Sequence, residues 1–354
     1  MSPTFLVSRT DAIGDVVLTL PVCGVLKQQF PGCQVVLIGR GYTAAVAAAC
    51  PWVDAFLELD ARVEKGELPV EPFLAQLRSY VAAAIIHVFP NKLLARLAKE
   101  AKIPVRIGTR NRLFHWLTCN RLVALSRRHS PLHEAQLNLQ LLAPLDYIAA
   151  PPLVEVADFV RLAPAVPLAA QWQALLAARQ PGQLNIILHP RSRGSAREWG
   201  LPNFGELARQ LYTAGHRIFV TGTAAEGEEL AAANWLRDYQ PYLAADLTGA
   251  FALPEFIAFI AAADGLVAGS TGPLHLAAAL GRHALGLYPP IRPMHPGRWG
   301  PLGPRAEYLV FNKPDCQDCR TAPAACSCIK AISTAMVMAR LATWQQINAT
   351  REVV

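Results

Sequence analysis

The segment Arg-Thr-Asp-Ala-Ile-Gly-Asp-Val at residues 9–16 places two carboxylates beside a glycine, just after an apolar run. A carboxylate at the start of a helix can cap the exposed backbone amides, or it can point into a crevice and act as a general base. For Asp15 the spacing alone favours capping, and both roles stay open at this stage. Gly14 permits a tight turn before the helix. The segment therefore supplies one candidate base and a second carboxylate, that of Asp11.

A second segment, Arg-Ser-Arg-Gly-Ser-Ala-Arg at residues 191–197, follows the apolar run Leu184–Leu188 and has the composition of a phosphate cradle. Guanidinium groups pair with phosphate oxygens through two parallel hydrogen bonds, and small residues let backbone amides approach the same oxygens. A basic loop that only faces solvent has the same composition, so this alternative is kept. If the loop binds phosphate, its candidate contacts are Ser192, Arg193 and Arg197.

A third segment, Ala-Gly-Ser-Thr-Gly-Pro-Leu-His at residues 268–275, runs from a predicted strand into a predicted helix. The amides and the dipole of a helix N-terminus attract anions, and Pro273 suits the first position of such a helix. Thr271 and Gly272 are therefore the firmer candidates for contact with an anion. His275 either touches the same anion or packs between helix and sheet, and the second role is the commoner one for a single histidine.

Four of the eight cysteines lie close together near the end of the chain, as Cys316-x-x-Cys319 and Cys326-x-Cys328. This pattern resembles the ligand usage of zinc sites, although the second pair is closer than the common two- to four-residue spacer. Two interpretations stay open, a structural zinc and four free thiols.

Parallel sheets with covering helices would position the first segment, because short aliphatic runs alternate with helical patterns along the N-terminal half. The predicted strands are Phe5–Ser8, Gln34–Ile38, Ala84–Val88 and Pro104–Ile107. The predicted helices begin after Gly14, after Gly41 and near Asn91, and another spans Leu132 to Leu142. In an open α/β sheet ligands gather at the carboxyl ends of the strands, which is where residues 9–16 fall.

The alternation restarts after a proline-rich stretch between residues 149 and 182, whose composition is typical of a crossing between domains. The predicted elements beyond it are strands Leu184–Leu188, Arg217–Thr221, Gly265–Ala268 and Ala284–Leu287, and helices Asn203–Ala214, Pro254–Ala262, Pro273–Leu280, one from Ala225, and Ile329–Ile347. We therefore expect an N-terminal domain at residues 1–165, a second domain at 166–330 and a C-terminal helix within 331–354.

Composition excludes several classes of protein. With 354 residues, 53% hydrophobic and 17% charged, the chain is too apolar to be disordered and too long for one ordinary core. It contains neither the G-x-G-x-x-G fingerprint nor a Walker A P-loop. Apolar runs fall short of a membrane span, and the N-terminus does not look like a secretory signal, so we expect a cytoplasmic protein. The net charge of +7 favours anionic partners: nucleic acid, anionic lipid or phosphorylated small molecules.

The three segments occur in order with further motifs, and together they resemble glycosyltransferase family 9, the ADP-heptose:lipopolysaccharide heptosyltransferases. The stretches that carry the resemblance are residues 9–21, Arg197-Glu198-Trp199 with Asn203-Phe204, Asp246-Leu247-Thr248-Gly249, residues 270–281 and Arg298-Trp299-Gly300-Pro301. They span nearly the whole chain.

The resemblance implies an α/β protein with the GT-B fold, two Rossmann-like domains facing across a cleft. It implies that the N-terminal domain binds the acceptor, that the second domain binds the nucleotide sugar, and that the C-terminal helix packs back on the N-terminal domain. The implied chemistry is inverting transfer with no metal or other cofactor required, so that any zinc at the cysteines would be structural.

Roles for single residues follow from the same resemblance. Asp15 matches the general base, Arg197 stands where the family has a phosphate-contacting lysine, and Glu226 matches an acidic residue at the adenosine ribose. The family usually has aspartate where this chain has Ser270. The implied catalytic residues are Asp15 and Arg197, the donor-binding residues Ser192, Arg193, Glu226, Ser270, Thr271, Gly272 and His275, and the acceptor-binding residues Asp11, Arg110, Arg112 and Arg128.

The implied partners are a nucleotide-sugar donor and a lipid-linked or lipopolysaccharide-core acceptor, with peripheral contact at the cytoplasmic face of the inner membrane. A family member that uses another nucleotide sugar or acceptor is the first alternative. A nucleic-acid-binding protein would interleave aromatic and basic residues, which only Arg110–Trp116 does, so we expect no nucleic acid. A nucleotide-sugar epimerase would need no basic acceptor face, and the Asp15 segment argues against it.

Overall fold

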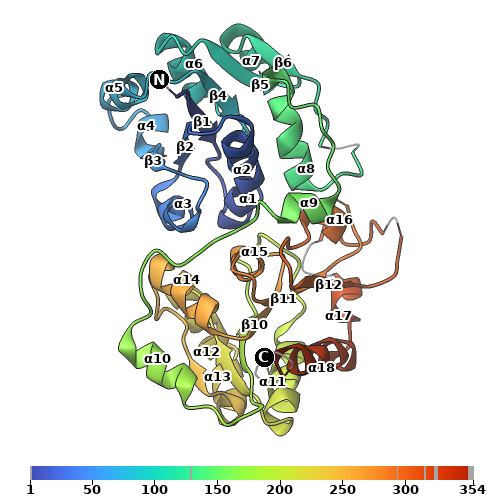
Figure 1. Ribbon diagram of the computed structural model, residues 1–354. Helices are drawn as coiled ribbons and strands as arrows, with labels where there is room; N and C mark the ends of the chain where they lie inside the picture. The colour runs from blue at the N-terminus through green and yellow to red at the C-terminus, as the bar shows by residue number, and fades with distance from the viewer. Residues whose placement is uncertain (1, 128–129, 293, 315, 323–325, 350–354) are drawn as a thin grey trace. The chain divides into compact units, whose positions relative to one another are not determined.

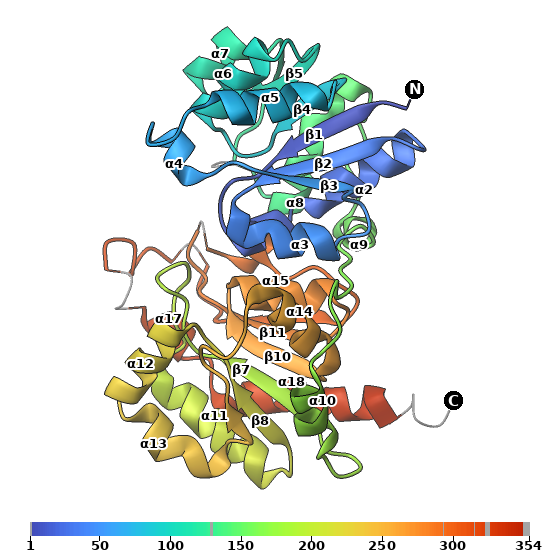
Figure 2. The same ribbon diagram turned by 90° about the vertical axis from the view of Figure 1, so that its left-hand side faces the viewer.

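The computed structural model describes residues 2–127, 130–292, 294–314, 316–322 and 326–349. The chain divides into two compact units, Met1–Ala163 and Pro164–Val354. Each unit is built on one six-stranded sheet in which all paired strands are parallel, with helices on both faces (Figures 1 and 2). The predicted α/β class with two Rossmann-like halves is therefore confirmed. Among the described residues, no helix is long and apolar enough to cross a membrane.

The sheet of unit 1 has the strand order β3-β2-β1-β4-β5-β6. Its strands are β1 (Thr4–Ser8), β2 (Gln34–Gly39), β3 (Ala55–Glu58), β4 (Ala84–His87), β5 (Val105–Thr109) and β6 (Arg121–Val123). The order reverses between β1 and β4, and open α/β sheets bind ligands at the carboxyl ends of the strands beside such a reversal. The loops that begin at Arg9 and Val88 lie at that point.

The helical segments of unit 1 are α1 (Ile13–Val17), α2 (Leu20–Gln29), η1 (Gly41–Thr43), α3 (Ala44–Ala49), α4 (Ala61–Glu64), α5 (Glu71–Ser79), α6 (Lys92–Glu100), α7 (Leu113–Thr118), α8 (Glu134–Leu139), η2 (Gln140–Leu145) and α9 (Leu153–Ala157). Helix α6 shows why they form where they do. The Asn91 side chain caps it by accepting a hydrogen bond from the Leu94 amide at 2.9 Å. Leu94 and Leu97 are buried against the sheet while Lys92 and Arg96 face solvent.

The sheet of unit 2 has the order β12-β11-β10-β7-β8-β9, so its reversal lies between β7 and β10. Its strands are β7 (Asn185–His189), β8 (Arg217–Val220), β9 (Ala245–Asp246), β10 (Gly265–Gly269), β11 (His283–Tyr288) and β12 (Ala306–Val310). Because β7 and β10 are neighbours, the loops that leave their carboxyl ends share one edge of the sheet. These loops are the second and third segments singled out in the sequence.

The helical segments of unit 2 are α10 (Ala170–Ala177), α11 (Leu201–Thr213), α12 (Ala224–Ala232), α13 (Trp235–Tyr239), η3 (Gln240–Tyr242), α14 (Leu253–Ala262), α15 (Gly272–Ala279), α16 (Pro296–Trp299), α17 (Ser327–Lys330) and α18 (Thr334–Ala349). Helix α18 belongs to the core of this unit, because Trp344 is fully buried and donates a hydrogen bond to Glu307 Oε1 at 2.8 Å. Its packing on the N-terminal domain stays a prediction.

Candidate functional site

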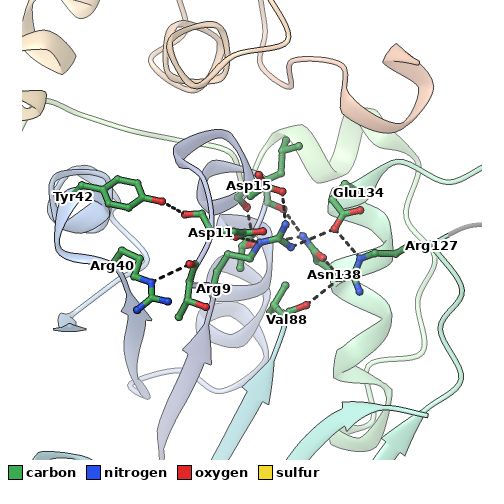
Figure 3. Close-up of polar contacts among 12 residues, drawn as sticks. Arg9, Asp11, Asp15, Arg40, Tyr42, Val88, Arg127, Glu134 and Asn138 are labelled. Atoms are coloured by element: carbon green, nitrogen blue, oxygen red, sulfur yellow. Dashed lines mark hydrogen bonds and ion pairs between the residues drawn. The ribbon is translucent and has the colours of Figure 1, made fainter. Parts of the chain in front are cut away.

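The first candidate segment forms a buried ionic cluster at the carboxyl end of β1. Helix α1 begins at Ile13 with Ala12 as its N-cap, so Gly14 lies inside the helix, and the turn predicted at this glycine is wrong. The Asp15 carboxylate makes no capping hydrogen bond. It forms an ion pair with the guanidinium group of Arg9 instead (Figure 3). Capping, which the spacing favoured, is therefore not the role of Asp15.

Arg9 is the centre of this cluster, and only 3% of its surface is exposed. Its Nε donates to Asp11 Oδ1 at 2.6 Å, its Nη2 donates to Asp15 Oδ1, and its Nη1 donates to Glu134 Oε1 at 3.3 Å. The ring of Phe89 lies 5.8 Å from the guanidinium carbon. One buried cation thus orients three carboxylates, from the β1 loop, from α1 and from α8 (Figure 3).

A second arginine fixes the side of the cluster formed by α8. Arg127 Nε donates to Glu134 Oε1 at 2.8 Å, and its Nη2 donates to Val88 O at 3.1 Å and to Asn138 Oδ1 at 3.0 Å. Asn138 in turn donates to the Leu18 carbonyl at 3.0 Å, just after α1. These bonds connect α1, the β4 loop and α8, so the carboxylate of Asp15 sits in a rigid frame.

Burial raises the pKa of Asp15 to about 6, from its ordinary value of 3.8. The positive charge of Arg9 acts against this rise, while the negative charges of Asp11 and Glu134 add to it. Burial alone would lower the pKa of Arg9, but the surrounding carboxylates raise it above its ordinary value, so Arg9 stays charged. At neutral pH Asp15 is therefore ionised and basic enough to take a proton from a hydroxyl group.

A pocket of about 570 Å³ opens beside the cluster within unit 1. It is lined by Thr10, Arg40, Glu64, Phe89, Pro90, Asn91, Lys92, Leu93, Arg96, Phe114, Leu117 and Thr118. Arg40 in its wall pairs with Glu64 and donates to the Leu59 carbonyl at 2.8 Å. Thr10 and Phe89 belong to the two loops at the strand reversal, so the pocket reaches the loop that leads into α1, the helix that carries the candidate base.

The residues predicted to bind the acceptor are not gathered in one place. Asp11 lies in the ionic cluster and pairs with Arg9. Arg110 and Arg112 are exposed on the turn between β5 and α7. Arg128 lies outside the described residues.

The loop after β7 is held by its own side chains. Arg191 pairs with Glu198, through Nη1 and Oε2 at 2.7 Å, and with Glu229. The Ser192 hydroxyl has two acceptors within hydrogen-bond distance, the Ala196 carbonyl at 3.2 Å and Glu198 Oε1 at 3.1 Å. Ser192 is thus engaged within the loop. Arg191 is neutralised by two glutamates, Glu198 and Glu229.

Arg193 and Arg197 differ sharply within that loop. Arg193 is exposed and has a positive φ of 50°, next to Gly194 with a φ of 78°. Arg197 is 9% exposed, and its Nη2 donates to the Cys319 carbonyl at 3.1 Å while its Nε lies 3.4 Å from Cys319 Sγ. The cysteine segment therefore holds the guanidinium group of Arg197, a connection that the sequence did not indicate.

The loop after β10 leads into α15, with Thr271 as the N-cap residue. Thr271 is 6% exposed, and its Oγ1 has no hydrogen-bond partner among the described residues. A Cβ on Gly269 would lie 3.4 Å from the Arg197 carbonyl oxygen, an ordinary van der Waals contact, so the two loops of this edge lie side by side. His275 is buried within the first turns of α15. The two predicted phosphate loops are thus brought together.

Glu226 and Ser270 also have partners of their own. Glu226 is the third residue of a capping box on α12: its Oε2 accepts from the Thr223 amide at 2.7 Å. Burial lowers the pKa of the neighbouring His189 to about 4, although the charge of Glu226 acts in the opposite direction. Ser270 lies near the hydroxyl of Tyr288, which donates to the Trp299 carbonyl at 2.6 Å, and burial raises the pKa of Tyr288.

The four predicted zinc ligands are all buried free thiols. Cys316 Sγ and Cys328 Sγ lie 3.7 Å apart, close to the edge of about 3.8 Å in a tetrahedron with Zn–S bonds of about 2.3 Å. A carboxylate oxygen of Asp318 and these two sulfurs all lie within 4.8 Å of one another. Burial raises the pKa of Cys326, and the nearby thiol of Cys319 adds to this rise. Asp318 joins the candidate set, a ligand that attention to cysteine spacing alone had missed.

Comparison with known proteins gives concordant results. The family model "Glycosyltransferase family 9 (heptosyltransferase)" matches residues 75–330. A Haemophilus influenzae protein assigned to the glycosyltransferases, with no substrate in its name, is 28% identical over 87% of this chain and 89% of its own length. Lipooligosaccharide heptosyltransferase 2 of the same organism is 25% identical over 80% of this chain and 82% of its own. The structure of Escherichia coli ADP-heptose lipopolysaccharide heptosyltransferase II superposes with a TM-score of 0.76 at 19% identity, covering 98% of this chain and 99% of that one.

Proposed function

Because the chain belongs to glycosyltransferase family 9, we propose that it transfers a heptose from ADP-heptose to a saccharide of the lipopolysaccharide core. The family assignment makes it a glycosyltransferase; the donor, the acceptor and the role of each residue are our proposal. The donor and the acceptor are suggested by relatives that are named lipooligosaccharide or ADP-heptose heptosyltransferases. We further propose that the N-terminal unit binds the acceptor and that the second unit binds the donor.

The observation that carries the proposal is the buried carboxylate of Asp15, with a pKa of about 6 and a fixed ion pair to Arg9. In the proposed step Asp15 accepts the proton of an acceptor hydroxyl as that oxygen attacks the anomeric carbon of the donor. The bond between this carbon and the diphosphate oxygen breaks, and its electron pair leaves with the nucleoside diphosphate. Attack from the face opposite the leaving group inverts the configuration at the anomeric carbon.

Positive charge for the departing diphosphate is available in unit 2. The first-turn amides of α15, the guanidinium group of Arg197 and the hydroxyl of Thr271, which has no partner among the described residues, would meet the phosphate oxygens. Arg193, exposed in the adjoining loop, is positioned to add a mobile cation. Because these protein groups can stabilise the leaving charge, we propose catalysis that requires no metal.

The remaining donor residues have supporting roles in this proposal. Gly272 and His275 line the start of α15, and Ser192 shapes the loop that carries the arginines. Glu226 would face the adenosine ribose from the start of α12. Serine at position 270, where the family usually has aspartate, favours the alternative that this enzyme takes a different sugar on the nucleotide, because a hydroxyl cannot replace the charge of a carboxylate.

On the acceptor side we propose an anionic, lipid-linked saccharide, bound through Asp11, Arg110, Arg112 and Arg128. An enzyme with such an acceptor would work at the cytoplasmic face of the inner membrane without spanning it. At the cysteines we propose a structural zinc, supported by the spacing of Cys316 and Cys328 and by the carboxylate of Asp318. A nucleic-acid-binding role and epimerase activity are not favoured by any contact described above.

The proposal is tested by release of ADP from ADP-heptose in the presence of truncated core lipopolysaccharide. We expect turnover by the wild type and a loss of about 10²- to 10⁴-fold in kcat for Asp15→Asn, the range for loss of a general base. Asp60→Asn, at a partly exposed aspartate that also pairs with an arginine, is the matched control and should keep full activity. Full activity of Asp15→Asn would refute the base assignment. Failure of ADP-heptose to react or bind, with another nucleotide sugar accepted, would favour the alternative donor.

A further inference from the structure

Helix α7 of unit 1 presents three large apolar side chains to solvent. Leu113 is 87% exposed, Trp116 59% and Leu117 75%. The opposite side of the helix is buried, because the His115 ring accepts a hydrogen bond from the Thr109 amide at 3.0 Å. A Cβ on Gly108 would collide with the same ring, so α7 packs directly on β5. The exposed side chains therefore lie on a fixed helix.

The ends of α7 are secured as well. Trp116 Nε1 donates to the Arg110 carbonyl at 2.9 Å, and Lys99 Nζ donates to the Leu117 carbonyl at 2.9 Å. Arg106 Nε donates to the Thr118 carbonyl at 2.7 Å. These bonds hold the helix against α6 and β5, and they leave the indole and the two leucines outward. Such a cluster of exposed apolar side chains marks an interaction surface.

The segment that carries these side chains is rich in basic residues. Residues 92–121, which run from α6 to β6, contain a single acidic residue, Glu100. Its carboxylate lies 3.6 Å from Arg96. The exposed cations of the same stretch are Lys92, Arg96, Lys99, Lys102, Arg110, Arg112 and Arg121. We call these cations together with Leu113, Trp116 and Leu117 the α6–α7 surface.

We propose that the α6–α7 surface docks on an anionic lipid bilayer, with Leu113, Trp116 and Leu117 at the boundary between headgroups and acyl chains. Basic residues around exposed Trp and Leu side chains are the composition of segments that bind membrane interfaces. Each Lys or Arg near an anionic leaflet adds attraction, and Trp favours the headgroup level. The docking proposal specifies which surface makes the proposed contact with the inner membrane. It rests on the proposed function for the location of the protein in the cell.

Other occupants fit the surface less well. A second copy in a two-fold contact would bring this cationic face onto itself, which electrostatic repulsion opposes. Nucleic acid would satisfy the cations but would leave two exposed leucines without an apolar partner. A bilayer satisfies both parts of the surface.

The position of the pocket agrees with this orientation. Leu117 belongs to the α6–α7 surface and also lines the 570 Å³ pocket, whose wall includes Lys92 and Arg96. Docking through α7 would place the pocket mouth at the level of the headgroups, where the saccharide of a lipid-linked acceptor lies. The surface would thus present its pocket to substrates held in the membrane.

The test is flotation of the full-length protein with vesicles of phosphatidylcholine, with or without phosphatidylglycerol. We expect binding only when phosphatidylglycerol is present, and a loss of at least about tenfold in affinity for Leu113→Gln/Trp116→Gln. Lys102→Gln/Arg121→Gln, which removes two exposed cations that do not hold α7, should weaken binding about fivefold or more. Val81→Gln/Ile148→Gln is the matched control, because these side chains are 86% and 88% exposed elsewhere in unit 1. Thermal melting checks that every variant is folded.

Absence of wild-type binding to the phosphatidylglycerol vesicles would overturn the proposal. So would equal binding by Leu113→Gln/Trp116→Gln, or a wild-type dimer that this variant dissociates. Release of ADP with a delipidated core oligosaccharide separates the two proposals. If the protein binds the vesicles but turns over no nucleotide sugar, the proposed function is wrong and the docking proposal is retained. If transfer proceeds without vesicle binding, only the docking proposal is wrong.

Discussion

Arg9 sets the chemical state of the candidate base. It pairs with three carboxylates, and without its charge the burial of Asp15 and the negative charges of Asp11 and Glu134 would raise the pKa of Asp15 further. The single cation therefore keeps Asp15 ionised at neutral pH while leaving it more basic than an exposed aspartate. A carboxylate with a pKa close to the working pH is an effective proton acceptor.

The pH dependence of transfer follows from this value. Asp15 must be ionised to accept the proton, so kcat/KM should rise about tenfold per pH unit up to pH about 6 and then level off. The measurement is initial rates of ADP release between pH 4.5 and 8, within the range where the fold is stable by circular dichroism. Asp15→Asn should lose this rising limb in its residual activity. A rate that stays constant down to pH 4.5 would contradict the assignment.

The free energy of unfolding should change with pH in the direction opposite to the rate of transfer. The folded-state pKa of Asp15 is raised above its ordinary value, so the protonated form favours the fold, and this contribution is lost as pH rises from about 4 through about 6. At neutral pH the ionised carboxylate costs the fold free energy. We therefore expect the melting temperature of Asp15→Asn at pH 7 to equal or exceed that of the wild type. A clear fall would indicate that Asp15 is needed for folding.

Part of this cluster was predictable from residues, and part was not. Asp15 stood out because a carboxylate beside glycine follows an apolar run. The pairing of Arg9 with Glu134 was missed, since the two residues are 125 positions apart and no local pattern connects them. The capping role assigned by spacing failed for a related reason: a buried arginine competes for the carboxylate more strongly than backbone amides do.

Among the elements of unit 2, α15 carries the clearest prediction. Replacing Thr271 by valine keeps the shape of the side chain and removes a buried hydroxyl that has no partner among the described residues. The fold should be unchanged or slightly more stable. ADP should bind about 10- to 100-fold more weakly, because a hydrogen bond to a charged phosphate is lost. Calorimetric titration with ADP measures this, and Thr271→Ser is the control that retains the hydroxyl. Undiminished affinity of Thr271→Val would exclude the contact.

The segment around α17 should couple metal content to donor binding, because Cys319 holds Arg197 through its carbonyl and its sulfur. We expect about one zinc per chain by native mass spectrometry, and loss of zinc in Cys316→Ser/Cys328→Ser. The KM for ADP-heptose should rise more than the KM for the acceptor. Cys23→Ser, a buried thiol of unit 1, is the control. A wild type without zinc, or with zinc unaffected by these substitutions, would favour four free thiols.

Prediction of elements from the sequence succeeded where apolar runs are long and bounded by glycine or proline. Strands β7 and β10 and helix α15 were expected within one or two residues of their observed bounds. Strands β6 and β9 were not expected, since they have three and two residues at sheet edges and too little apolar pattern to detect. Helix α7 was not expected either, because its exposed face carries Trp and Leu in place of polar residues.

For the whole molecule, the distribution of charge matters more than the total of +7. In unit 2, near the predicted diphosphate, Arg191 is neutralised by two glutamates and Arg197 is buried against the cysteine segment, while Arg193 is exposed. In unit 1 the cations of residues 92–121 face solvent with one carboxylate among them. Salt screens exposed charges strongly and buried ones weakly, with a Debye length of about 10 Å at 0.1 M and about 3 Å at 1 M. The two substrates should therefore differ in their response to ionic strength.

We expect the KM for lipid-linked core acceptor to rise several-fold between about 0.1 M and about 1 M NaCl, while the KM for ADP-heptose changes less. The acceptor meets exposed cations, whereas the diphosphate meets a buried guanidinium and helix amides. Initial-rate measurements with each substrate varied in turn provide the comparison. Arg209→Gln, which removes an exposed cation of unit 2 paired with Glu206, should leave both salt responses unchanged. Equal salt dependence for both substrates would mean that the exposed charge of unit 1 does not take part in acceptor capture.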